Sequence, residues 1–227
     1  MDTKQTDYKG FLFDIFLYLT IMFLVREIYL SQFPFIANGL MWSFSTLIIA
    51  KWRMKVRNIT WSDLGLQKPK SLLKTLLITI GILISIPISI IVFEQVQDLL
   101  PFTLSPDTSS EDAVSKFGNL KGNWIHFFKI IPFILIQSTL EELLDRGFLI
   151  NWFERLFSKT NLATTFAVIL QAVIFGFRHS YDISERSITV GIIGLIMGIA
   201  YVKFGRNLWP LIIAHCILNT MSMIGKI

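Results

Sequence analysis

Polar side chains that could perform acid–base chemistry interrupt three apolar runs of this sequence. They are, in chain order, Glu141, Glu142, Arg146, His179, His215 and Asn219. Ionisable groups are costly at bilayer depth, so they usually mark a functional site there. Carboxylates, imidazoles and an amide held away from bulk water can activate a water molecule and stabilise an oxyanion. We therefore predict one reactive centre built from these three runs.

The spacing of these residues predicts how they face. Three pairs lie four residues apart, the spacing at which side chains share a face of a helix: Glu142 and Arg146, Phe175 and His179, and His215 and Asn219. Glu142 precedes Arg146, which is the favourable order for an intrahelical ion pair. Glu141 points about 100° away from Glu142 on a helix, so the two must differ in role. Glu141 has no partner within its own helix, since Asp145 at the fourth position is another acid, and it needs one from elsewhere.

Counting residues places the polar groups at similar depths. Glu141 and His179 are equally far along the chain from a turn near Thr160, so antiparallel helices joined there would bring them level. If the membrane surface lies near Asn151, Glu141 is roughly 15 Å below it, from the helical rise. The same rise places His215 roughly 12 Å past the turn before its own run. These depths predict a shared site close to the cytoplasmic face.

The elements that must position these residues are membrane-spanning helices. The chain is 53% hydrophobic, has 20 phenylalanines and carries few charges outside the segments between apolar runs. A spanning helix needs about 20 apolar residues. Candidate runs cover residues 11–30, 34–50, 72–94, 123–145, 162–179, 188–204 and 208–224. We predict an all-α, polytopic transmembrane bundle of about six or seven spans, in which the short second run is tilted or re-entrant.

The chain is expected to form a single integrated membrane domain with two parts. Residues 1–122 supply the N-terminal helices, a basic cytoplasmic loop at 51–74 and a polar external loop at 95–122. Residues 123–222 form the core that carries the polar groups. Lysine and arginine next to spans mark the cytoplasmic side, so the turns near 158–161 and 203–207, and the N-terminus, are expected there too. The predicted location is the cell membrane, crossed several times.

Composition also excludes some functions. The net charge of +5 comes from basic residues that flank apolar runs, so membrane topology explains it and no nucleic-acid partner is expected. The single cysteine, Cys216, excludes an internal disulfide and a cysteine-rich metal site. Oligomeric state does not follow from these features.

Three motifs resemble those of a known family of membrane proteases. They are Glu141-Glu142-x-x-x-Arg146, Phe175-x-x-x-His179 and His215-x-x-x-Asn219, which resemble the EExxxR, FxxxH and HxxxN signatures of the CPBP family. This family comprises the CAAX-protease and bacteriocin-processing proteins, also called Abi, with type II CAAX prenyl endopeptidases among them. The resemblance covers roughly residues 123–222. Two residues look unusual for it: Asp145, at a commonly aromatic position, and Arg178, directly before the histidine.

The resemblance implies an intramembrane endopeptidase that cleaves a peptide or membrane-associated protein within the lipid bilayer. By that analogy Glu141 is the general base that activates a water molecule, and His179 helps to hold the water. His215 and Asn219 position the water or stabilise the oxyanion. Three further residues shape the site: Glu142, Arg146 and Phe175.

Two questions stay open at the level of sequence. Glu141, His179 and His215 match a His₂Glu zinc shell in ligand type, yet the HExxH spacing is absent, and a metal-free, glutamate-activated water fits equally well. A non-catalytic membrane partner in bacteriocin self-immunity or signalling is the alternative function, kept open by Asp145 and Arg178. A proton-coupled carrier is disfavoured because no inverted repeat is present.

Overall fold

The computed structural model describes residues 7–101, 103–105 and 116–227. The helices are α1 Tyr8–Arg26, α2 Phe35–Val56, α3 Leu72–Val96, η1 Gln97–Leu99, α5 Trp124–Glu141, η2 Glu142–Leu149, α6 Ile150–Leu156, α7 Ala163–Ser180, α8 Glu185–Lys203 and α9 Trp209–Ile224. Each predicted apolar run overlaps one of them, which confirms the all-α bundle. Part of the predicted external loop, including Asp107, Glu111 and Asp112, lies outside the described residues.

Three helices of the described part are long and apolar enough to cross a membrane by composition alone. They are α1, α3 together with η1, and α8, while α9 is a shorter apolar helix. The helices that carry the candidate site residues, α5, α7 and α9, are less apolar or shorter because polar groups interrupt them. This composition, together with the many exposed large apolar side chains, is that of a membrane protein.

Helix α2 is longer than predicted. It continues through Val56, so the first basic residues of the predicted loop at 51–74 are helical. Arg53 lies on this last part of α2 and pairs with Asp14 of α1 at 2.7 Å, and Arg57 pairs with the same fully buried carboxylate at 2.8 Å. The buried acid explains why charged residues extend a helix here rather than begin a loop.

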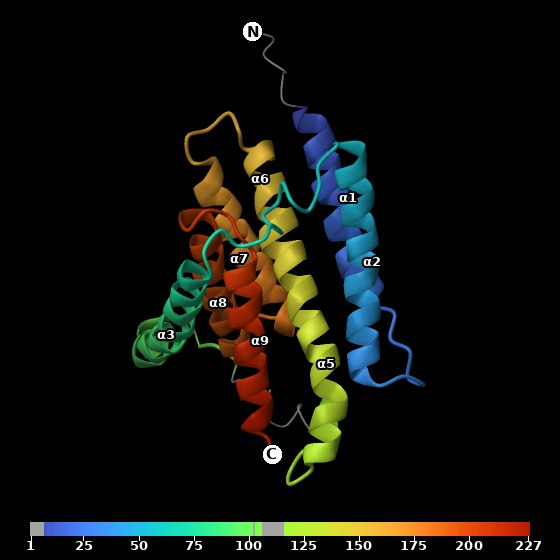
Figure 1. The fold of residues 1–227 in the computed structure, drawn as a ribbon, viewed down its shortest axis with the longest axis vertical. Helices are drawn as coiled ribbons and strands as arrows, with labels where there is room; N and C mark the ends of the chain where they lie inside the picture. The colour runs from blue at the N-terminus through green and yellow to red at the C-terminus, as the bar shows by residue number, and fades with distance from the viewer. Residues whose placement is uncertain (1–6, 102, 106–115) are drawn as a thin grey trace.

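The loops gather at two opposite ends of the bundle, as Figure 1 shows. The end that we call the basic end contains the start of α1 and residues 57–71, 157–162 and 204–208. The end that we call the cavity end contains residues 27–34, 116–123, 181–184 and 225–227. At the basic end the Leu208 N–H donates to the Gly65 carbonyl at 3.0 Å, and at the cavity end the Gly122 N–H donates to the Ile227 carbonyl at 2.8 Å. The segments predicted to be cytoplasmic therefore share one end.

Helices α7 and α8 pack closely because glycines face the neighbouring backbone. A Cβ at Gly176 would overlap the Ser187 carbonyl oxygen and lie 3.0 Å from the Gly191 Cα. A Cβ at Gly194 would lie 3.1 Å from the Phe175 ring. Small residues at such contacts allow membrane helices to approach each other. The close contact fixes the end of α7, where Phe175 and His179 lie.

Helices α5, η2 and α6 form one continuous rod through the bundle, seen in yellow-green to yellow in Figure 1. Its middle part, η2, is a π-helix, and the Ile150 N–H donates to the Asp145 carbonyl five residues before it. This wider turn begins directly after Glu141. Single π-turns within α-helices are frequent at functional sites.

Candidate active site

The π-helix buries three ionisable residues that the sequence places in one run. Glu142, Asp145 and Arg146 are each 0% exposed, whereas the Glu141 side chain keeps 13% exposure at the last position of α5. The widened turn rotates the residues after Glu141 relative to an α-helix, so acids adjacent in sequence enter different surroundings. The predicted difference between the two glutamates is therefore present in the structure.

His215 lies between the two glutamates. Its Nδ1 is 2.7 Å from Glu142 Oε1, and its Nε2 is 3.6 Å from Glu141 Oε2. Arg146 also donates to Glu142 Oε1, at 3.0 Å, as its spacing predicted. A carboxylate with such donors is an acceptor, so it favours the tautomer in which His215 carries a proton on Nδ1. The Nε2 atom then faces Glu141.

Phe175 links the arginine of the first motif to the histidine of the second. The Arg146 guanidinium carbon lies 4.2 Å from the centre of the Phe175 ring, and the His179 ring centre lies 4.7 Å from it. The His179 Nδ1 atom is 2.6 Å from the Phe175 carbonyl oxygen. Because a carbonyl only accepts, Nδ1 must be the donor, which leaves Nε2 of a neutral ring as an acceptor.

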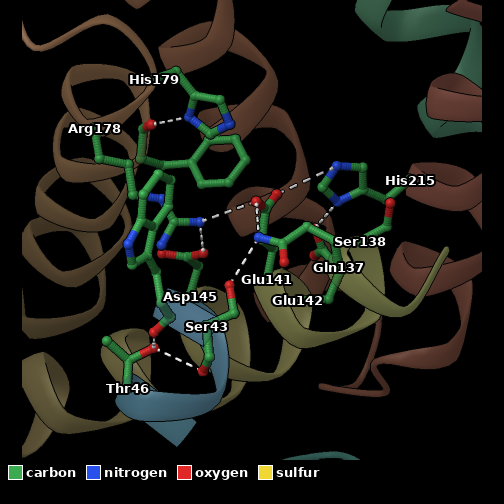
Figure 2. A network of polar contacts seen from close by, with 12 residues as sticks. Ser43, Thr46, Gln137, Ser138, Glu141, Glu142, Asp145, Arg178, His179 and His215 are labelled. Carbon is green, nitrogen blue, oxygen red and sulfur yellow. Dashed lines mark hydrogen bonds and ion pairs between the residues drawn. The ribbon is translucent and has the colours of Figure 1, made fainter. Parts of the chain in front are cut away.

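Glu141 has partners from other helices, as its position in the sequence predicted. In Figure 2 it lies between His215 of α9 and Arg178 of α7, whose Nη2 is 3.9 Å from Glu141 Oε1. The prediction that its own helix offers no partner is wrong, because Gln137 donates to Glu141 Oε1 at 3.1 Å. Gln137 also donates to Ser43 of α2 at 2.8 Å. The partner is an amide four residues earlier on the same helix face, which a pattern of opposite charges does not reveal.

The two residues that look unusual for the family contact each other. Arg178 Nη2 lies 2.6 Å from Asp145 Oδ2, and this carboxylate is fully buried. The guanidinium carbon also lies 5.0 Å from the Phe175 ring centre. The two residues thus form an ion pair between α7 and η2. Arg178 thus stands between Asp145 and Glu141, closer to Asp145.

All four residues predicted to be catalytic line one cavity of about 350 Å³: Glu141, His179, His215 and Asn219. Asn219 also donates to the Ser138 hydroxyl at 2.8 Å, which connects α9 to α5. Arg178, Gln137 and Ser43 contribute to the same lining. The prediction that three separate apolar runs bring their polar groups together is therefore confirmed.

The cavity extends away from the basic end of the bundle. Asn151, predicted to lie near the membrane surface, is buried among the helices, and Trp152 beyond it is fully buried. The rod continues to Leu156, so Glu141 lies roughly 22 Å along the helix from the basic end. The cavity is lined by the late part of α1, the early half of α2 and the end of α9, so it extends toward the cavity end.

The three side chains proposed as zinc ligands do not form a metal-binding group as they lie. Within residues 7–101, 103–105 and 116–227, no cluster of three or more His, Cys, Asp or Glu side chains is arranged to hold a metal ion. His215 Nδ1 is bonded to Glu142, and His179 Nδ1 to a backbone carbonyl, so a metal ligand from either ring would be its Nε2 atom.

Fold and site together define a helical membrane protein whose core holds carboxylates and imidazoles around one cavity. Residues 123–221, from the start of α5 into α9, match the family described as Type II CAAX prenyl endopeptidase Rce1-like. The family resemblance predicted from the three motifs is thus confirmed, and it supports a membrane protease. No curated protein and no solved structure matches this chain.

Proposed function

We propose that the protein is an intramembrane endopeptidase in which Glu141 activates a water molecule for hydrolysis of a peptide bond. The observation that carries this proposal is the position of His215, bonded to Glu142 through Nδ1 with its Nε2 facing Glu141. The family match over residues 123–221 is independent support for a protease.

The tautomer of His215 suggests where the water binds. With a proton on Nδ1, the neutral ring presents a lone pair at Nε2 to a carboxylate oxygen 3.6 Å away, and two acceptors face each other. A water molecule that donates one hydrogen to each acceptor resolves this arrangement. The water oxygen is then free to attack a carbonyl carbon. His179 lines the same cavity and helps to confine this water beside Glu141.

Peptide hydrolysis follows from these positions. Glu141 takes a proton from the water as the oxygen bonds to the carbonyl carbon, and the carbonyl oxygen becomes an oxyanion. Asn219 has a second amide hydrogen beyond the one given to Ser138 and lines the cavity, so we assign it to the oxyanion. A hydrogen-bond donor to the oxyanion stabilises the transition state by about 3–4 kcal/mol. As the C–N bond breaks, Glu141 returns the proton to the leaving amine.

The substrate is a peptide or the tail of a membrane-associated protein that reaches the cavity from the bilayer region. The family's description suggests prenylated CAAX tails as one class. A leader peptide or a signalling peptide is the other class that we consider. The basic end and the N-terminus face the cytoplasm in this proposal.

Replacement of Glu141 tests the mechanism. The Glu141→Gln variant keeps the size and the hydrogen bond from Gln137 but cannot accept a proton. We expect hydrolysis to fall about 10²–10⁴-fold, the contribution typical of a general base. The measurement is mass spectrometry of new peptide termini after purified protein in liposomes meets a proteome-derived peptide library and a farnesylated CAAX peptide.

The exposed Glu94 of α3 provides the matched control. Glu94→Gln should hydrolyse peptides at the rate of the unaltered protein, and both variants should elute as the same species in detergent. Treatment with a zinc chelator should leave the rate unchanged. Unaltered hydrolysis by Glu141→Gln refutes the proposed base, and loss of activity with chelator that zinc restores refutes the metal-free mechanism.

A non-catalytic role is the second candidate, favoured by Arg178 beside Glu141. A carboxylate with a guanidinium 3.9 Å away is a weaker base than an unpaired one. If the cluster were only structural, the protein would act as a membrane partner in bacteriocin self-immunity or signalling. Its biological phenotype would then survive Glu141→Gln.

A further inference from the structure

Two cationic side chains from the cavity end, Arg26 and Lys226, line the cavity that holds Glu141. Among the lining residues that the structure describes, Glu141 is the one carboxylate, and Arg178 is already paired with Asp145 deep in the bundle. A low-dielectric cavity with an excess of one charge attracts ligands of the opposite charge.

Arg26, the last residue of α1, is held by aromatic rings. Its guanidinium carbon lies 4.6 Å from the centre of the Trp42 ring and 4.8 Å from that of Tyr181. Among the described residues, no carboxylate lies within ion-pair distance of Arg26. Cation–π contacts position the planar group while its N–H donors stay available for an anion. Trp42, Tyr181 and Arg26 all line the cavity.

Lys226 provides a second cation from the end of the chain. It follows α9, the helix that carries His215 and Asn219, and it lines the same cavity. No ion pair joins it to a carboxylate in the part of the chain that the structure describes. Arg26 and Lys226 therefore bring positive charge to this cavity from α1 and from the end of α9.

The rest of the lining combines polar side chains around Glu141 with apolar ones. The apolar ones include Phe35, Ile36, Phe117, Ile134 and Met223. Clefts that are mostly apolar with a few fixed polar groups bind ligands by burial and orient them by the polar groups. A ligand that satisfies this lining has apolar side chains and at least one carboxylate.

We propose that Arg26 and Lys226 recognise the carboxylates of an apolar, acidic peptide segment that enters from the cavity end and places its scissile bond at Glu141. This inference rests on the proposed endopeptidase activity, which favours a peptide over an anionic lipid as the ligand. Positive charge on both sides of the cavity makes acidic side chains, or a free C-terminal carboxylate, the specificity determinant. Among the described lining residues, the one carboxylate is then the base rather than a binding group.

Binding to a protein that cannot cleave tests the recognition separately from the chemistry. The Glu141→Gln protein is placed in nanodiscs of zwitterionic lipid. It is titrated with two fluorescent apolar hexapeptides of otherwise identical sequence. One contains two glutamates, and the other has glutamines at the same two positions. We expect the acidic peptide to bind at least about tenfold more tightly, the scale of desolvated charge pairs. Arg26→Gln added to this protein should remove most of that preference, and Arg26→Lys should retain part of it.

Arg155 offers a matched control, because it also lies over two rings, Phe11 and Trp152, but does not line the cavity. Arg155→Gln should leave the preference unchanged. The inference is overturned if the two peptides bind equally or if neither binds. It is also overturned if Arg26→Gln leaves the preference for the acidic peptide unchanged. Loss of the preference in nanodiscs of anionic lipid also overturns it, because the cations then bind headgroups. Acidic peptides that bind but are never cleaved by the unaltered protein contradict the proposed function and leave this inference standing.

Discussion

Glu141 and Glu142 show how neighbouring identical residues acquire different chemistry. Glu142 is fully buried and accepts from Arg146 and His215, so its lone pairs serve to orient an imidazole. Glu141 lines the cavity and faces the other nitrogen of the same ring at 3.6 Å. One histidine thus connects an orienting carboxylate to the proposed base, an arrangement in which a carboxylate fixes the tautomer of a histidine.

Asp145 keeps Arg178 away from the proposed base. We predict that Asp145→Asn weakens the 2.6 Å pair and lets the guanidinium move closer to Glu141, which makes Glu141 a weaker base. Peptide hydrolysis should fall by roughly tenfold, equivalent to about 1.4 kcal/mol in the barrier. The readout is kcat/KM for a peptide that the unaltered protein cleaves.

The double variant Asp145→Asn with Arg178→Gln separates this effect from simple loss of packing. Removal of the guanidinium should restore part of the activity lost in Asp145→Asn. Equal activity of Asp145→Asn and the unaltered protein would contradict a positioning role for this pair.

At the scale of helices, the contact between α7 and α8 holds His179 in place. We predict that Gly176→Ala forces these helices apart, because the added Cβ would overlap the Ser187 carbonyl oxygen. Overpacking of this kind costs about 1–3 kcal/mol. Thermal unfolding in detergent measures the loss. Gly81→Ala in α3 is the control, since no atom lies within 4 Å of its added Cβ, and equal melting temperatures of both variants would refute the steric argument.

The end of the long rod is held to the turn before α9 at the basic end, outside the apolar runs. Arg206 donates to both carboxylate oxygens of Glu154, at 2.7 and 2.6 Å. Burial opposes ionisation of Glu154, but hydrogen bonds from Arg206 and Thr164 outweigh burial and lower its pKa. A carboxyl whose pKa is lower when folded contributes stability above its ordinary pKa of about 4.3, and loses it as the pH falls through the folded value.

The pH dependence of one variant tests this pair. Glu154→Gln should melt a few degrees below the unaltered protein at pH 7, for a contribution of about 1 kcal/mol after solvent screening. The difference should shrink as the pH is lowered below the ordinary pKa of glutamate. A difference that is independent of pH would show that the ion pair contributes no linkage.

At the scale of the whole molecule, the basic segments and the cavity lie at opposite ends. Lysine and arginine beside spans favour the cytoplasmic side, so we predict that the cavity end faces outward. In a Cys216→Ser background, Asp182→Cys at the cavity end should react with a membrane-impermeant maleimide in intact cells. Lys68→Cys at the basic end should react only after permeabilisation. The reverse labelling pattern would place the cavity toward the cytoplasm.

The spacing of residues along the chain was sufficient to predict many local features of this protein. Helical runs, the Glu142–Arg146 pair and the contact of His179 with Phe175 all follow from periods of three to four residues, which depend on neighbours in the chain. The three motifs were also sufficient to predict the family whose description matches residues 123–221. Each of these features is a property of a short segment, so it can be read without knowing where other segments lie.

Tertiary structure decided the rest, because it depends on contacts between residues far apart in the chain. The π-turn after Glu141, the position of His215 between two glutamates and the pairing of Arg178 with Asp145 require packing of α5, α7 and α9. The charge of the cavity arose in the same way, since Arg26 and Lys226 come from near opposite ends of the chain and meet one cavity only when the bundle closes.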